Sequence, residues 1–198
     1  TMPIAIIGGG SIGSFVTYSL LKLGCQDVTI FDHDIVEEHN CGSQIYSETD
    51  ISKPKVEALK DKLFFLSPIE PKIRQERWTP QISLKGFDIV IAAVDTMQVR
   101  KDLFESIKLT VPHYIDGRMA RNEINLYYTF LPDSMAYDFY KDTLFTDEES
   151  SPVLCSERAV SYNSMIVGGL ISAQVAQIAN GDKPKREIIV DLKNFMMS

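Results

Sequence analysis

The chain has 198 residues, of which 44% are hydrophobic and 24% are charged, and this fits one globular domain with a sizeable core. Its net charge of −7 comes without a basic stripe, so a role in binding nucleic acid is disfavoured. Three cysteines without a CxxC pair argue against a disulfide framework and a four-thiolate zinc site, and no apolar run is long enough to cross a bilayer. We therefore expect a cytoplasmic protein without nucleic-acid or membrane partners.

The first third of the chain predicts a strand, a helix and a second strand. Residues 3–7 form a short apolar run, which three consecutive glycines follow. Apolar residues then recur every three or four positions over 12–23, as on the buried face of a helix, and Gly24 stands in the usual C-cap position. Residues 28–31 predict the second strand, which ends at an aspartate.

The middle of the chain continues this alternation of strands and helices. Ser52 is a predicted N-cap for a helix whose apolar stripe runs from Val56 to Leu66. Residues 87–94 are almost continuously apolar, which is typical of a strand buried on both faces of a parallel sheet. The other predicted elements here are a strand at 73–78, a helix that ends near residue 109 and a strand at 113–116.

The pattern changes in the C-terminal third. Residues 123–131 alternate and predict an antiparallel strand, whereas 132–158 are irregular and acidic and predict a mobile crossover. A long helix rich in small residues is expected over 161–180, followed by a strand at 187–192. The whole chain, 1–198, thus predicts a single α/β domain: a Rossmann-like, doubly wound, mostly parallel sheet with an antiparallel C-terminal extension.

Gly8, Gly10 and Gly13 form a G-x-G-x-x-G pattern between the first predicted strand and the first predicted helix. In such a turn one glycine permits the tight bend, one lets a phosphate approach the backbone, and one lets the helix pack on the strand. Asp32 ends the second strand, where a carboxylate can accept hydrogen bonds from ribose hydroxyls. These features predict a nucleotide site, against the alternative of a glycine turn without a ligand, and leave both NAD and ATP open.

Four short segments after the glycine loop resemble, in order and spacing, the motifs of one enzyme family. Residues 32–36, DHDIV, resemble its D-x-D-x-V segment, and residues 40–44, NCGSQ, match N-x-x-R-Q at the first and last positions. Residues 53–57, KPKVE, look like G-x-P-K-V-E, and residues 94–100, VDTMQVR, resemble T-D-N-x-x-x-R. On these segments the chain resembles the ThiF/MoeB family, the bacterial relatives of ubiquitin-activating enzymes, over nearly its whole length.

The resemblance implies a homodimeric adenylyltransferase that uses ATP and Mg²⁺ to activate the C-terminal carboxylate of a ubiquitin-like or sulfur-carrier-like small protein or peptide. Because the barrier to adenylation is mostly electrostatic, cations must surround the phosphates. By resemblance, Lys55 would supply one of these charges, Asp95 would hold Mg²⁺, and Cys155 would accept the activated acyl group. The implied nucleotide-binding residues are Gly8, Gly10, Ser11, Ile12, Gly13, Asp32, Asp34, Asn40, Gln44 and Lys55.

The chain departs from the family pattern at one charged position. Ser43 stands where the family has the arginine that faces the phosphates, and the candidate replacements are Arg100, Arg118, Arg121 and Arg158. Two alternatives therefore stay open. One is a catalytically weak or inactive relative that binds nucleotide or acts as a scaffold. The other is an NAD-dependent oxidoreductase, in which the lysine and the aspartate assigned above would have no role.

Several of these residues also have a purely structural interpretation. Asp95 can be a helix N-cap, Asn40 can shape a turn, and Lys55 can be a solvated helix lysine. Cys155 is either a reactive thiol, with a pKa lowered by Arg158 or by the following helix, or an ordinary buried cysteine. The three histidines have no metal-ligand spacing and predict turn or core positions.

Overall fold

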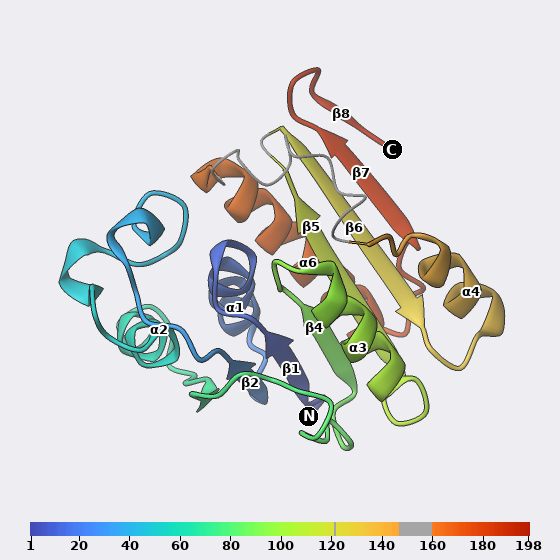
Figure 1. Ribbon diagram of the computed structural model, residues 1–198, viewed down its shortest axis with the longest axis horizontal. Coiled ribbons are helices and arrows are strands. Elements are labelled where there is room, and N and C mark those ends of the chain that lie inside the picture. Colours follow the sequence, from blue (N-terminus) through green and yellow to red (C-terminus); the bar gives the residue numbers. More distant parts are fainter. Residues whose placement is uncertain (121, 147–159) are drawn as a thin grey trace.

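In the computed structural model, which describes residues 1–120, 122–146 and 160–198, the chain forms one eight-stranded sheet with helices on both faces (Figure 1). The strand order is β3-β2-β1-β4-β5-β6-β7-β8; β1 to β5 are parallel, and β6, β7 and β8 each run antiparallel to the strand before. The predicted doubly wound sheet with its antiparallel extension is confirmed. The strands are β1 (Ile4–Ile7), β2 (Val28–Phe31), β3 (Lys72–Arg74), β4 (Ile89–Ala92), β5 (His113–Met119), β6 (Glu123–Phe130), β7 (Glu187–Asp191) and β8 (Met196–Met197).

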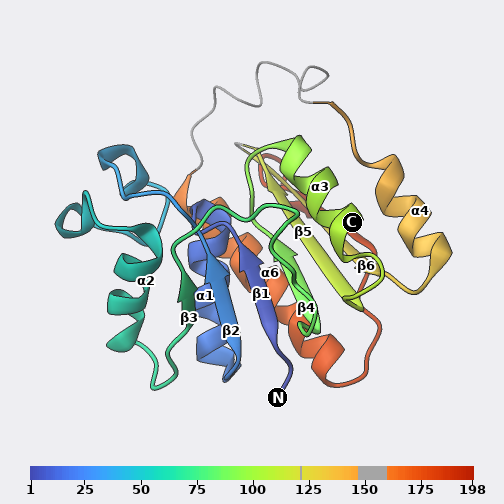
Figure 2. The same ribbon diagram turned by 60° about the horizontal axis from the view of Figure 1, so that its bottom comes forward.

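The helices form two layers, one on each face of the sheet (Figure 2). The helices are α1 (Ser11–Leu23), α2 (Lys55–Phe64), α3 (Met97–Ile107), α4 (Ser134–Asp142) and α6 (Ser161–Ala179), with 3₁₀ turns η1 (Glu38–Asn40) and η2 (Glu48–Asp50). The hydrophobic core beside α1, α2 and α6 is separated by the sheet from the core beside α3 and α4.

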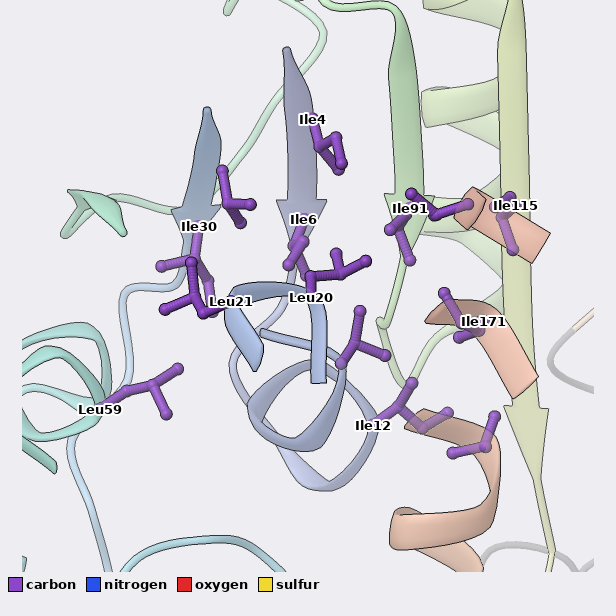
Figure 3. Packing of buried hydrophobic residues seen from close by; sticks show 14 of the residues in the cluster. Ile4, Ile6, Ile12, Leu20, Leu21, Ile30, Leu59, Ile91, Ile115 and Ile171 are labelled. Atoms are coloured by element: carbon purple, nitrogen blue, oxygen red, sulfur yellow. The ribbon is translucent and has the colours of Figure 1, made fainter. Parts of the chain in front are cut away.

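All four residues of β1 are buried, because this strand lies at the centre of the sheet with a helix layer on each face. Successive side chains of a strand point to opposite faces. Ile4 and Ile6 accordingly pack in the core beside α1, where Figure 3 shows Ile6 next to Leu20, whereas Ala5 and Ile7 pack in the core beside α3. A polar residue at any of these four positions would enter one of the two cores.

Residues 134–142 were expected to be irregular, and this prediction is wrong, because they form α4. The Asp133 carboxylate caps the helix by accepting hydrogen bonds from the N–H groups of Met135 and Ala136. Ala136 and Tyr140, one helical turn apart, face the core. The remaining predicted crossover residues from 147 on lie outside the described residues.

Two predicted boundaries also differ from the structure. Ser52 does not cap a helix; its φ of 72° places it in a left-handed turn, and α2 begins only at Lys55. The strand expected at 73–78 is short, because β3 ends at Arg74 and the Trp78 side chain packs into the core beside α3 instead. β8 was not predicted, since two exposed residues carry no periodic signal.

α6 lies along α1 and approaches it closely at a glycine. A Cβ atom on Gly168 would lie 3.0 Å from both the backbone and the side chain of Phe15, whereas one on the next residue, Gly169, would meet open space. The small side chains of α6 therefore serve close helix packing within the domain. None of the described helices combines the length and the apolarity needed to cross a bilayer.

This pair of glycines gives a matched test of the α1–α6 contact. We expect Gly168→Ala to lower the free energy of unfolding by about 1–3 kcal/mol, because the new methyl group overpacks the helix interface. Gly169→Ala should raise it by about 0.5–1 kcal/mol, because alanine is the better helix former at an open position. Urea unfolding of both variants measures the two values, and equal effects at the two positions would contradict the packing described here.

Candidate functional site

The candidate site lies where the strand order reverses, at the carboxyl edge of the sheet. From β1 the chain passes through α1 to β2 on one side, whereas β4 pairs with β1 on the other side. Loops that leave two such strands diverge, and ligands of open α/β sheets bind between them. The glycine loop follows β1, Asp32 follows β2 and Asp95 follows β4, so the structure brings these predicted site elements to one edge.

The glycine loop is held by two close backbone approaches. Gly8 has a φ of 102°, and a Cβ atom there would overlap the carbonyl oxygen of Ala93 in the loop after β4. A Cβ atom on Gly13 would overlap the carbonyl oxygen of Gly8. Two of the predicted glycines are thus required by the turn itself, and the Gly8 contact joins the glycine loop to the segment that leads to Asp95.

The N-terminus of α1 has no side-chain cap. Its N-cap residue is Gly10, which has no group to accept hydrogen bonds from the first-turn N–H groups. The first helical residues, Ser11 and Ile12, therefore present backbone donors and the positive end of the helix dipole at the carboxyl edge. Such a terminus suits a phosphate group.

Asp32 joins β2 to the glycine loop. Its Oδ2 accepts a hydrogen bond from the Gly9 N–H at 2.6 Å, and its Oδ1 accepts one from the Asp34 N–H at 2.7 Å. The Tyr46 hydroxyl donates to the Gly9 carbonyl at 2.7 Å, so the loop is held from both sides. An ionised carboxylate has about four acceptor positions, which leaves Asp32 able to accept hydrogen bonds from a ribose.

Lys55 and Asp34 form an ion pair beside Asp32. The Lys55 Nζ lies 3.0 Å from the Asp34 Oδ2, and the lysine is buried except for 7% of its surface. Partial burial raises the pKa of the Asp34 carboxyl, but Lys55, together with His33 and Arg77, lowers it by more, so this pKa lies below its ordinary value. The Arg77 Nε donates to the His33 Nε2, which lies 3.2 Å from the Asp34 Oδ1, so the guanidinium of Arg77 adds a second cation to this corner of the site.

The segment from Ile35 to Pro54 crosses the glycine loop and carries two further predicted residues. Asn40 accepts the Glu37 N–H with its side-chain oxygen, so it shapes the η1 turn as its structural interpretation proposed. The Gln44 amide nitrogen lies 4.0 Å from the position of a Cβ atom on Gly10, and its buried Oε1 has no hydrogen-bond partner within the described ranges. Gln44 is therefore placed to contact a ligand at the α1 N-terminus.

Asp95 is exposed at the carboxyl edge, directly after β4. Thr96, not Asp95, is the N-cap residue of α3, and among the described residues the Asp95 carboxylate forms no hydrogen bond or ion pair. Its charge and hard oxygen atoms suit Mg²⁺. Asp32, His33 and Asp34 also lie close enough together to hold a metal ion, but Asp34 is paired with Lys55 and the His33 Nε2 already accepts a hydrogen bond from Arg77. The exposed carboxylate of Asp95 is therefore the better candidate for a Mg²⁺ ligand.

The model of the ThiF family matches residues 1–197. The chain belongs to the ThiF family. This confirms the resemblance drawn from the four short segments, and it agrees with the architecture, in which the glycine loop, Asp32 and Asp95 lie at the carboxyl edge of one sheet.

Individual members of the ThiF family and solved structures show similarity over part of their length. The chain is 32% identical over 115 residues to tRNA threonylcarbamoyladenosine dehydratase 1 of Saccharomyces cerevisiae, covering 52% of this chain and 26% of that protein. It is 26% identical over 170 residues to molybdopterin-synthase adenylyltransferase of Salmonella typhimurium, covering 82% and 61%. It thus spans about a quarter of the first relative and three fifths of the second. PaaA (TM-score 0.77, 19% identity) and E. coli MccB solved with ATP (TM-score 0.79, 16% identity) share the fold over 100% of this chain and 63% of theirs.

Two of the arginines proposed to replace the family's missing arginine are used elsewhere in this ThiF-family chain. Arg100 and Arg118 both pair with the fully buried Asp116, at 2.9 and 2.7 Å. Both guanidinium groups are therefore held by Asp116, whereas the Ser43 hydroxyl lies 3.4 Å from that of Ser11 at the start of α1. The other candidates, Arg121 and Arg158, and the predicted acyl acceptor Cys155 lie outside the described residues.

Sequence reasoning missed three residues that organise the site: Tyr46, Arg77 and Asp116. Tyr46 contacts Gly9 of the glycine loop, and Arg77 contacts His33 beside Asp32 and Asp34. The partners lie 37 and 44 positions apart in the sequence, so no local pattern predicts either contact. Asp116 did carry a signal, because an aspartate at the end of an apolar run in a central strand must find a partner when the strand is buried.

Proposed function

We propose that this ThiF-family chain is an ATP-dependent adenylyltransferase that activates the C-terminal carboxylate of a ubiquitin-like or sulfur-carrier-like protein or of a peptide. One observation carries the proposal: an uncapped helix N-terminus and a carboxylate without a partner among the described residues lie on the two sides of the strand reversal, with Asp32 beside them. The names of relatives support it, since they include an adenylyltransferase and a ubiquitin-like modifier-activating enzyme, and the structural neighbour MccB was solved with ATP and with MccA.

Each group at the edge of the sheet has a role in this reaction. The α1 N-terminus and Lys55 bind the phosphates, and Asp32 orients the ribose. A carboxylate of the substrate attacks the α-phosphorus, a new C–O–P linkage forms, and pyrophosphate leaves with the electron pair of the broken bond. Mg²⁺, held by Asp95, would supply charge neutralisation on the phosphates. Gln44, whose buried oxygen has no partner in the described part of the chain, is free to turn its amide toward the nucleotide.

The proposal extends to the step after adenylation. The Cys155 thiolate would attack the acyl carbon, form a thioester and release AMP. Cys155→Ala should then spare ATP–pyrophosphate exchange and block only the later acyl transfer. We also place the protein in the cytoplasm and propose that it is a homodimer. The lack of charged residues over 161–180 suits a contact between subunits, and sedimentation measurements would test the dimer.

ATP–pyrophosphate exchange, measured with Mg²⁺ and a candidate ubiquitin-like protein or peptide, tests the proposal directly. Exchange supports the adenylyltransferase. ATP binding without exchange for every carboxylate offered favours a nucleotide-binding scaffold. Binding of NAD without binding of ATP would end the proposal.

A substitution at Lys55 tests its role at the phosphates. We expect Lys55→Gln to weaken ATP binding roughly 10–100-fold, because a charged hydrogen bond is worth roughly 1.5–3 kcal/mol. Lys60→Gln is the matched control, since Lys60 lies on the same helix and pairs with Glu70 away from the site. Isothermal titration with ATP measures both, and equal affinities for the two variants would remove Lys55 from the phosphate site.

A further inference from the structure

A buried ion-pair cluster lies next to the candidate metal site. Asp116 on β5 is fully buried, and its register partner on β4 is Ala92, the last residue of that strand. The Oδ1 of Asp116 accepts a hydrogen bond from Arg100 Nε at 2.9 Å, and its Oδ2 accepts from Arg118 Nε at 2.7 Å and from the Tyr140 hydroxyl at 2.9 Å. One carboxylate therefore joins β5 to α3 and to α4.

Arg100 extends this cluster to the turn that carries Asp95. Its Nη1 donates to the Thr96 carbonyl at 3.3 Å, and its Nη2 donates to the Gly117 carbonyl at 3.2 Å. Thr96 directly follows Asp95 and makes no side-chain capping bond. Asp116 thus sets the position of the Arg100 guanidinium, and this guanidinium in turn holds the Thr96 carbonyl at the start of α3.

Arg118 forms the other arm of the cluster and does not reach this turn. Its two terminal nitrogens donate to the carbonyl and hydroxyl oxygens of Thr143, the C-cap residue of α4, at 2.9 and 3.0 Å. The guanidinium also lies 4.5 Å from the centre of the Tyr127 ring. The Asp116 carboxylate is therefore connected through Arg100 to the turn that carries Asp95, and through Arg118 to the end of α4.

We infer that Asp116, acting through Arg100, is a positioning residue that fixes the Asp95 carboxylate for Mg²⁺; this rests on the function proposed above. Groups that orient a metal ligand commonly change metal affinity or activity by 10–100-fold when they are removed. The contact of Arg100 with the Thr96 carbonyl fixes the main chain next to Asp95, and this reduces the conformational entropy that must be lost when the carboxylate binds a metal ion. A buried ion pair is by itself weak evidence for added stability, which leaves orientation as the role that this geometry favours.

The two arms allow a matched experiment on the intact chain. Arg100→Lys and Arg118→Lys each keep a positive charge beside Asp116, and each removes the additional hydrogen bonds of one guanidinium. The measurements are the melting temperature, the ATP affinity in EDTA, and the Mg²⁺ concentration that half-saturates the gain in ATP affinity, the last two by isothermal titration. Thr96→Gly is a further variant, which loosens the turn at an exposed position without entering the cluster.

We expect Arg100→Lys to raise the half-saturating Mg²⁺ concentration about 10–100-fold while ATP affinity in EDTA stays unchanged. Both arginine variants should lower the melting temperature to a similar degree. Arg118→Lys should, however, leave the Mg²⁺ dependence as in the wild type. Thr96→Gly should raise the Mg²⁺ requirement with little loss of stability, and it decides the matter if Arg100→Lys does not fold. Equal Mg²⁺ shifts in both arginine variants, or a shift in none of the three, overturn the inference. A wild type that binds ATP without any effect of Mg²⁺ overturns the proposed metal role, and the inference with it.

Discussion

Asp95→Asn should reduce ATP–pyrophosphate exchange by more than about 100-fold, beyond the roughly 10–100-fold typical of residues that only orient a metal ligand. Asparagine keeps the size of the side chain and one oxygen atom but loses the negative charge, and Mg²⁺ prefers a carboxylate. The Asp95 side chain is exposed, and within the described part of the chain it makes no contact that stabilises the fold. Its replacement should therefore change the free energy of unfolding by less than about 0.5 kcal/mol.

The control for this experiment lies at the other end of the same strand. Asp88 precedes β4 at the amino edge of the sheet, so Asp88→Asn makes the same chemical change away from the site. Exchange rates over a range of Mg²⁺ concentrations, together with ATP affinity in EDTA, separate loss of the metal from loss of the nucleotide. Exchange that survives in Asp95→Asn at the wild-type rate would place the metal elsewhere.

Asp116→Asn should cause the largest loss of stability of any single substitution considered, about 3–5 kcal/mol at pH 7. The change leaves the guanidinium groups of Arg100 and Arg118 buried without their counter-charge. Since whole domains have unfolding free energies of about 5–15 kcal/mol, this loss is a large share of the total. The exposed pair of Asp27 and Lys72 is the matched control, and Asp27→Asn should cost less than about 1 kcal/mol.

The contribution of Asp116 should also depend on pH. Complete burial raises the pKa of the Asp116 carboxyl, but the charges of Arg100 and Arg118 lower it by more, so its pKa in the folded protein lies below the ordinary value. The unfolded chain then binds the proton more tightly, and the stabilisation is complete above the unfolded pKa of about 3.9 and is lost as the pH falls through the folded pKa. The difference between wild type and Asp116→Asn in urea unfolding should therefore be constant near neutral pH and shrink below about pH 4. A difference that grows on acidification would contradict this account.

The order of strands and helices and the main parts of the site follow from local patterns in the sequence. A strand, a tight turn and a helix within 23 residues are enough to place the glycine loop, because each step depends on neighbouring residues. Asp32 and Asp95 were predicted at the edge for the same reason, since each directly follows an apolar strand and parallel strands end together. The short α4 was missed although its cap, Asp133, and its buried face were present in the sequence.

Which charges serve the site and which serve the fold was decided only by the tertiary structure. Arg100 and Arg118 were equal candidates for the phosphates in the sequence, and packing directed both to Asp116. Ser164 of α6 donates to the carbonyl of Ser43, 121 positions earlier, and so helps to hold the loop over the α1 N-terminus. A contact between distant residues depends on how whole layers pack, and a buried charge must pair with whatever the fold brings within reach. The sequence by itself therefore determined the fold class, the glycine loop and its two aspartates, whereas the partners of the buried charges required the packed chain.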